Sequence, residues 1–251
     1  MKKEMEKIAA LHRRKEGSIE ATAPPRSIID HLMRHNYPSE EALLSDLFIL
    51  IFAGHETSAT TLCFLLMELT KDSSVKNKLR SELASFMPDQ PSLIDLSQQE
   101  SNNLLSTIAN CQYLNNCIQE SMRLWPAAAG GPMRTPDKDV QYDGMVIPAG
   151  SLVIVHFFSM FRSDWIANSE TFDPDRWLNT NSQLPQLKEM IIPFSAGKRN
   201  CIGQNMAMLQ LRVITAYFIR YFDFELVEEP VKEYFITLKP ASMMMKVRKA
   251  Y

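Results

Sequence analysis

The chain has 251 residues, of which 45% are hydrophobic and 22% are charged, and its formal net charge is −2. This composition is that of a globular protein long enough for one large hydrophobic core or two small ones. Basic and acidic residues are mixed along the chain, which gives no electrostatic footprint for nucleic acid.

Helical spacing of apolar residues dominates the first half of the chain. The predicted helices cover, in order, residues 4–15, 27–35, 39–71, 75–87 and 104–125. The stretches 17–25 and 88–101 carry helix breakers or polar residues and are predicted to be irregular.

The helix that opens at Ser39 is unusually long. Glu40 and Glu41 stand in its first turn, where the helix dipole favours acids. If it runs to Lys71, it is roughly 50 Å long, at about 1.5 Å per residue. Acidic residues interrupt its apolar stretch 43–69, and each acid at a bilayer centre costs about 2.5–3.5 kcal/mol. A buried helix is therefore expected.

From Val140 onward the apolar pattern becomes strand-like. The predicted later elements are strands over 140–142, 145–147 and 151–156, a loop-rich stretch over 161–193, a helix over 204–221 and strands in the tail after 222. The fold class is therefore mainly α with small β-sheets.

The segment from Phe194 to Gly203 has the pattern Phe-x-x-Gly-x-Arg-x-Cys-x-Gly. Gly197 and Gly203 allow a tight turn and close approach of the backbone to a flat ligand. Cys201 stands at the start of the helix 204–221, where unpaired N–H groups favour a thiolate. Arg199 supplies a fixed positive charge for a carboxylate. Heme requires these features together.

The alternative is that Cys201 has no functional role and is a buried, unreactive thiol, as most free cysteines are. The flanking glycines and Arg199 argue against it. The other three cysteines, Cys63, Cys111 and Cys117, fall in helical patterns and are expected to be core thiols. No Cys-x-x-Cys spacing occurs, so neither a zinc site nor a thioredoxin-like motif is indicated. The low density of cysteines does not indicate a disulfide scaffold, and a reducing compartment fits better.

Polar residues interrupt the apolar stretch of the long helix at Gly54-His55-Glu56-Thr57-Ser58. Buried polar groups need partners, so this acid–alcohol pair indicates a ligand, water or an internal hydrogen bond. Glycine inside a helix costs about 1 kcal/mol relative to alanine, which is intelligible if something lies against the backbone there. The alternative is a kink in which Thr57 bonds back to a preceding carbonyl.

Taken together, these motifs resemble the cytochrome P450 family of heme-thiolate monooxygenases. The resemblance runs from about Glu4 to the C-terminus and implies the C-terminal part of that fold. Its parts would be a long central helix, a Glu-x-x-Arg helix, a meander loop and a cysteine-ligand loop. Residues 1–251 would thus form a partial cytochrome P450 domain that lacks the N-terminal half.

The resemblance assigns a role to particular residues. Cys201 would be the axial ligand of the iron in heme b, with Arg199, Phe194, Gly197 and Gly203 around it. Arg134 would contact a second propionate; its alternative is a surface arginine. Thr57 would contact bound dioxygen, and Glu56 would help relay protons. The structural lock would consist of Glu120, Arg123 and Arg176, and the substrate pocket would include Ala53, Ala127, Ala128 and Ala129.

The implied reaction inserts one oxygen atom from O₂ into a small apolar organic substrate, with electrons from an NADPH-dependent reductase or another donor. The implied parent enzyme is anchored in the endoplasmic reticulum membrane, with a cytoplasmic catalytic domain.

Two alternatives to this function stay open. One is a heme-thiolate isomerase or dehydratase acting on hydroperoxides, which would not need the Glu56-Thr57 pair. The other is an inactive, truncated heme-binding fragment.

Overall fold

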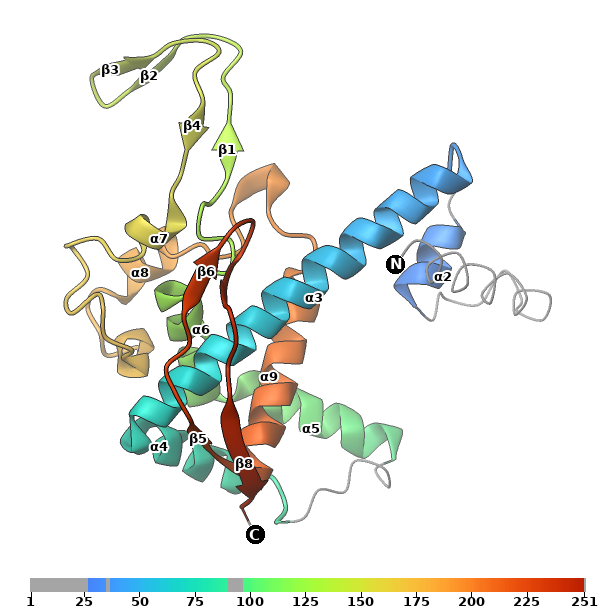
Figure 1. Cartoon of the computed structure of the whole chain (residues 1–251), viewed down its shortest axis with the longest axis vertical. Helices are drawn as coiled ribbons and strands as arrows, with labels where there is room; N and C mark the ends of the chain where they lie inside the picture. The colour runs from blue at the N-terminus through green and yellow to red at the C-terminus, as the bar shows by residue number, and fades with distance from the viewer. Residues whose placement is uncertain (1–26, 35–36, 90–96, 251) are drawn as a thin grey trace. The chain divides into compact units, whose positions relative to one another are not determined.

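The computed structural model describes residues 27–34, 37–89 and 97–250. The predicted helix 4–15 and the loop 17–25 lie outside these residues. The chain divides into two compact units, Met1–Glu56 and Thr57–Tyr251, and the boundary falls inside one long helix (Figure 1).

The described part of the first unit is helical. Helix α2, Ile28–Met33, begins after Ser27, whose hydroxyl accepts a 3.0 Å hydrogen bond from the Asp30 amide. Helix α3, Glu40–Lys71, begins after Ser39, whose hydroxyl accepts from the Ala42 amide at 3.1 Å. Both caps satisfy amides that a helix start leaves without a partner, and both follow from the sequence.

Helix α3 has the predicted bounds but not the predicted burial. Most of its buried side chains lie from Thr60 onward, for example Phe64 and Leu65, whereas in the first half Phe48 and Ile49 are exposed and Leu47 is buried. The cover of the second half comes from elements of the second unit, through contacts with α6, α9 and β7. The expectation of a helix buried throughout is therefore wrong for its first half. By length and composition α3 could also cross a membrane, with a mean hydropathy of 1.4 over its most apolar window.

Three helices follow: α4, Ser73–Ala84; α5, Gln98–Asn110; and α6, Gln112–Leu124. The single helix predicted over 104–125 is wrong, because α5 begins earlier and ends before Cys111. Ser97 and Glu100 form a capping box that starts α5 inside the stretch predicted to be irregular. At Cys111 the backbone is extended, and the Glu82 carboxylate of α4 accepts from the Tyr113 and Leu114 amides at 2.9 Å each, which starts α6.

The rest of the chain alternates short strands and helices. The elements are β1, Met133–Arg134; β2, Val140–Tyr142; β3, Met145–Ile147; β4, Val153–Ile154; α7, Phe157–Met160; the 3₁₀ turn η1, Pro174–Trp177; α8, Leu184–Met190; the 3₁₀ turn η2, Gly197–Arg199; α9, Gln204–Tyr221; β5, Phe222–Leu226; β6, Lys232–Tyr234; β7, Leu238–Pro240; and β8, Met245–Lys249. The strands pair antiparallel as β1–β4, β2–β3, β5–β8 and β6–β7.

Most of the strand predictions are confirmed, and α9 begins and ends at the predicted residues. The strand predicted over 151–156 is shorter, since only Val153 and Ile154 pair with β1. Helix α8 was missed inside the loop-rich stretch, where Pro185 stands in its first turn, a position that tolerates proline.

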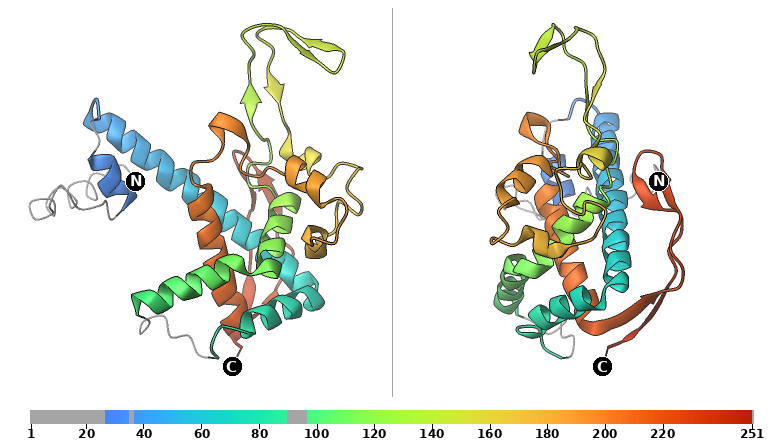
Figure 2. Two further views of the ribbon diagram at one scale, coloured as in Figure 1. Left: turned by 180° about the vertical axis from the view of Figure 1, so that it is seen from behind. Right: turned by 90° about the vertical axis from the view of Figure 1, so that its left-hand side faces the viewer.

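The main core of the second unit packs α4, α5, α6 and α9 against the second half of α3. A smaller cluster joins Phe64 and Met67 of α3 to Ala129 and to Leu238 of β7. Figure 2 shows strands β5 to β8 as a layer on one side of this half of α3, with α6 and α9 on the other side. Residues from both ends of the sequence of this unit therefore meet at α3.

Candidate functional site

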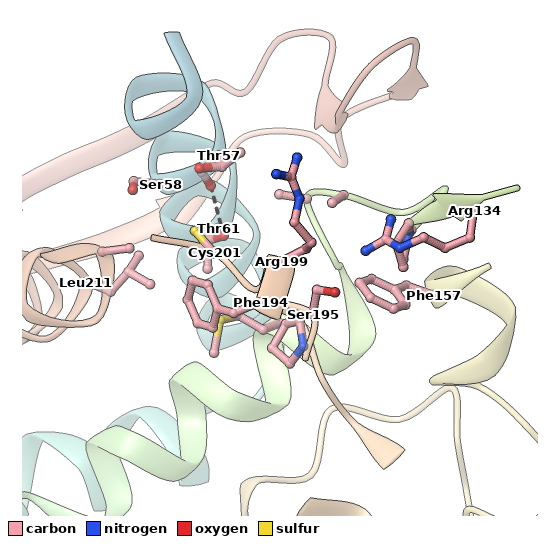
Figure 3. A pocket seen from close by; sticks show the side chains of 17 residues that line it. Thr57, Ser58, Thr61, Arg134, Phe157, Phe194, Ser195, Arg199, Cys201 and Leu211 are labelled. Carbon is pink, nitrogen blue, oxygen red and sulfur yellow. Dashed lines mark hydrogen bonds between the residues drawn. The ribbon is translucent and has the colours of Figure 1, made fainter. Parts of the chain in front are cut away.

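A cavity of about 400 Å³ lies in the second unit. Its walls come from α3, α6, the segment 127–134, the loop before α9, and α9 itself (Figure 3). The cavity therefore gathers residues from positions 57 to 211 of the chain, including Thr57, Arg134, Arg199 and Cys201.

The loop 194–203 presents Cys201 to this cavity. The Cys201 amide donates to the Phe194 carbonyl oxygen at 2.9 Å, which closes the loop. Inside the loop the backbone takes positive φ angles at Ser195, 62°, and Gly197, 75°. Glycine adopts this region without strain, whereas serine does so at a cost. Gly203 has an ordinary φ of −85°, and a Cβ added there would lie 3.9 Å from the Cys201 sulfur.

Cys201 differs from the other cysteines in its exposure. Its thiol is exposed, whereas Cys111 and Cys117 are buried and Cys63 is half-buried. Burial, together with the smaller effect of the nearby Glu82 charge, raises the pKa of the Cys111 thiol to about 11. Burial likewise raises the pKa of Cys63 and Cys117. A raised pKa keeps these thiols protonated at neutral pH. Cys111 and Cys117 lie in the main core, as the sequence predicts, whereas Cys63 is only half-buried.

The α3 wall of the cavity is formed by Thr57, Ser58 and Thr61. The Thr61 hydroxyl donates to the Thr57 carbonyl at 2.9 Å (Figure 3). The buried Ser58 hydroxyl has no hydrogen-bond partner among the described residues. The wall is thus apolar in part and also carries three hydroxyl groups.

The lining on α3 begins at Thr57. Glu56 and Ala53 precede it on the same helix, in the residues that belong to the first unit, and they are not part of the lining. A Cβ added to Gly54 would meet no atom of the described residues within 4 Å, so the expectation that a ligand lies against the backbone there stays a prediction. Ala53 is exposed.

Two arginines line the cavity: Figure 3 shows Arg134 beside Phe157, and Arg199 between Cys201 and Arg134. Arg134 lies on β1 and donates to the Met133 carbonyl at 2.8 Å. Arg199 ends the turn η2. In the part of the chain that the structure describes, neither guanidinium forms an ion pair with a carboxylate. Both positive charges are therefore available to an anionic ligand.

The segment after α6 forms another wall, and only part of the prediction for it holds. Ala127 and Ala128 line the cavity, but Ala129 is buried in the core cluster with Phe64 and Leu238. The Ala129 carbonyl accepts from the Phe158 amide at 3.0 Å, which fixes the backbone with the Ala129 methyl on the core side. The assignment of Ala129 to the pocket is therefore wrong.

Glu120, Arg123 and Arg176 come together as one buried network. The Arg123 guanidinium donates to both carboxylate oxygens of Glu120, at 2.9 and 2.8 Å, and Arg176 donates to Glu120 at 3.2 Å. Trp177 adds an indole N–H bond to Glu120 at 2.9 Å. Arg123 also donates to the carbonyls of Phe161, Ser169 and Thr171. Buried charges need such full pairing to be tolerated.

Sequence reasoning missed several lining residues. Thr61 lies one turn after Thr57, and Ala207 and Leu211 lie one turn apart on α9, so helical spacing could have found these three. Phe157 and Met122 also line the cavity. Nothing local in the sequence marks them, because chain segments far apart bring them there.

The residues present fit heme. The cavity offers one exposed thiol as a metal ligand, two arginines for propionates and glycines on either side of the thiol. No group of three or more His, Cys, Asp or Glu side chains that could hold a metal occurs among the described residues.

The family model and the curated proteins that this chain resembles are all cytochromes P450. A family model described as "Cytochrome P450" matches residues 1–249. Cytochrome P450 3A12 of Canis lupus familiaris is 32% identical over 208 residues, which cover 82% of this chain and 38% of that protein. Cytochrome P450 monooxygenase olcB of Penicillium canescens is 33% identical over 214 residues, covering 80% of this chain and 42% of that protein.

The fold agrees with these matches. A crystal structure of a cytochrome P450 (CYP102L1) superposes with a TM-score of 0.81 and 23% sequence identity, over 99% of this chain and 55% of that one. The chain spans about two fifths of the length of the curated relatives it matches. The match over nearly the whole sequence and the shared fold lead to one conclusion: the chain belongs to the cytochrome P450 family.

Proposed function

We propose that this chain carries the heme-binding part of a heme-thiolate monooxygenase, with heme b ligated by Cys201. One observation carries the proposal: Cys201 and Arg199 of the loop 194–203, Thr57 of α3 and Arg134 of β1 line the same cavity although they come from three separate segments. We further propose that residues 1–251 are part of a cytochrome P450 domain, since the relatives contain residues without counterparts in this chain.

Each residue of the cavity has a task in this proposal. Heme ligated by a thiolate supplies the means to activate O₂ and to insert one oxygen atom into an unactivated C–H bond. Cys201 provides the anionic ligand, and the loop closed by the Phe194 carbonyl fixes its position. Arg134 and Arg199 hold the propionates by charge-assisted hydrogen bonds.

Thr57 and Glu56 serve proton delivery in this proposal. Oxygen activation needs protons in a site that otherwise excludes water, and a hydroxyl on the cavity wall can pass them on. Thr57 lines the cavity, and Glu56 is its neighbour on α3. Alanines, Phe157 and Leu211 make the remaining wall apolar, which suits a small apolar organic substrate.

Electrons would come from a separate NADPH-dependent reductase or another donor. The parent enzyme in this proposal is attached to the endoplasmic reticulum membrane and has a cytoplasmic catalytic domain.

The test is isotope incorporation. The heme-loaded chain receives ¹⁸O₂, NADPH, a cytochrome P450 reductase and a panel of apolar probes: a fatty acid, a steroid and an alkylbenzene. The proposal expects one ¹⁸O atom in a hydroxylated product. In the Thr57→Ala variant more of the NADPH should end as hydrogen peroxide and less as product, because the hydroxyl that passes protons is gone.

The same preparation separates the alternatives. Rearrangement of a fatty-acid hydroperoxide without NADPH, unaffected by Thr57→Ala, would indicate an isomerase or dehydratase. Heme binding with neither reaction would indicate an inactive heme-binding fragment.

A further inference from the structure

A second hollow of the second unit, with a volume of about 450 Å³, shares no lining residue with the cavity around Cys201. Residues of α5, α6, α8 and the stretch around η1 line it. Most of them carry side-chain amides: Asn110, Gln112, Asn115, Asn116, Gln119 and Asn179. Ala109, Trp177 and Lys188 complete the described lining, in which Lys188 carries the only charge. We call this site the amide hollow.

One amide of the hollow, that of Asn115, is used by the fold. Its Nδ2 atom donates to the carbonyls of Ala109 and Cys111, at 3.0 and 2.6 Å. Its Oδ1 atom accepts from the Arg212 guanidinium of α9 at 2.7 Å. Asn115 therefore joins the end of α5 to α6 and α9, and its hydrogen bonds leave it little capacity for a ligand.

The next residue on α6, Asn116, differs from Asn115 in both burial and bonding. Only 6% of its surface is exposed, and its buried Nδ2 atom has no hydrogen-bond partner among the described residues. Buried N–H groups without a partner are rare in native proteins because leaving them unpaired is costly. Asn110, Gln112 and Asn179 are exposed, so Asn116 forms the base of the hollow and these three form its rim.

The chemistry of the lining indicates which molecule would satisfy it. A side-chain amide offers donors and an acceptor, and a half-turn of the Asn116 amide exchanges the places of its nitrogen and oxygen. A hydroxyl group likewise donates and accepts. A carboxylate or phosphate only accepts, so it would leave the amide oxygens unmatched, and a cation would be repelled by Lys188.

Trp177 adds an apolar surface to this lining. Its indole N–H donates to Glu120 at 2.9 Å, so the atoms that remain for the hollow are those of the apolar ring. Several amides around an aromatic ring match a molecule that has many hydroxyl groups and a face of C–H groups.

We propose that the amide hollow binds a small, uncharged, polyhydroxylated molecule of the sugar class, and that Asn116 is its hydrogen-bonding anchor. The bound sugar would supply the partner that the Asn116 amide lacks. This site does not depend on heme, so its test and the tests of the proposed function succeed or fail independently.

The test measures binding of maltose to the full chain by saturation-transfer NMR, with the maltose concentration varied. The original chain should bind maltose saturably, and Asn116→Leu should weaken the affinity about tenfold or more, because the anchoring hydrogen bond is lost. Asn77→Leu is the matched control, since Asn77 is exposed on α4 outside the lining of the hollow, and it should change the affinity less than about twofold.

Thermal unfolding without sugar checks that Asn116→Leu is folded. Leucine has a similar shape and removes the unpaired N–H group, so the midpoint should equal or exceed that of the original chain. A clearly lower midpoint would overturn the reading of Asn116 as an amide that lacks a partner in the free chain.

Three binding results would overturn the proposal. The first is the absence of saturable binding of maltose, glucose and sorbitol to the original chain. The second is undiminished binding of maltose to Asn116→Leu, which would place the sugar elsewhere. The third is displacement of maltose by equimolar inorganic phosphate in the original chain but not in Lys188→Gln, which would make the hollow an anion site.

Discussion

Arg123 and Glu120 form a two-bond ion pair that is completely shielded from solvent. The Nε and Nη2 atoms of Arg123 lie 2.9 and 2.8 Å from the two carboxylate oxygens, and neither side chain has any exposed surface. Arg176 and Trp177 complete the coordination of Glu120. This network joins α6 to η1 and, through Arg123, to the carbonyls of the stretch 161–171.

Removing Glu120 should destabilise the chain strongly. Glu120→Ala leaves Arg123 and Arg176 as buried charges without their carboxylate, which costs about 3–5 kcal/mol of unfolding free energy. Glu170→Ala is the matched control, since Glu170 pairs with Arg162 but 75% of its side chain is exposed, and it should cost under about 1 kcal/mol. Urea unfolding measures the unfolding free energy of both variants. Equal losses of unfolding free energy would contradict a dominant role for the buried network.

The two glycines of the cysteine loop should respond differently to alanine. Gly197→Ala forces a side chain into a left-handed conformation, φ 75°, and should cost about 1–2 kcal/mol of unfolding free energy. Gly203 has a φ of −85°, so alanine is tolerated by the backbone there. Its new methyl group would instead stand beside the Cys201 sulfur, so we expect weaker heme binding at nearly unchanged stability. Thermal unfolding without heme and a heme titration separate the two effects.

Glu82 should be essential to the start of α6, although it lies on α4. Its carboxylate accepts from the Tyr113 and Leu114 amides, and Glu82→Ala should cost about 1–2 kcal/mol, as losing a helix cap does. Glu82→Gln keeps one acceptor oxygen, so it should lose less unfolding free energy than Glu82→Ala. Amide hydrogen exchange should accelerate at Tyr113 and Leu114. Unchanged exchange at both amides would show that the cap is dispensable.

Asp223 should make stability depend on acid pH. Its hydrogen bond to Arg248, at 2.9 Å, and the nearby Lys76 lower the pKa of the Asp223 carboxyl to about 2. A carboxyl whose pKa is lower in the folded state stabilises the fold above its unfolded pKa, about 3.9, and loses this contribution as the pH falls toward 2. The contribution should stay under about 1 kcal/mol because solvent screens the group.

The predicted pH dependence is checked by the urea unfolding midpoints of the original chain and of Asp223→Asn, each measured at pH 5 and at pH 2.5. Asp223→Asn should lose less stability than the original chain when the pH falls from 5 to 2.5. In 1 M salt the losses of the two proteins should become more similar. An identical pH dependence of both proteins would count against the assignment.

Features encoded locally could be predicted from the sequence. The bounds of α3 and α9 and the β2–β3 hairpin follow from apolar spacing, caps and the turn Asp143-Gly144. Phe194, Arg199 and Cys201, which line the cavity, could be predicted in the same way, because they stand within one short loop that also contains two glycines.

Features that depend on distant partners could not be predicted. The break at Cys111 needs Glu82 on another helix, and the burial of Ala129 needs Phe158 and Leu238. The burial of α3 from Thr60 onward belongs to the same class, because it depends on side chains of α6, α9 and β7.

The most direct test of the central claim is the carbon monoxide difference spectrum of the chain after addition of heme and dithionite. A cavity in which Cys201 ligates the iron predicts the red-shifted Soret band of a thiolate-ligated ferrous heme, and Cys201→Ser should abolish it while Cys63→Ser leaves it intact. A Soret band without the red shift, or one that survives Cys201→Ser, would contradict the account.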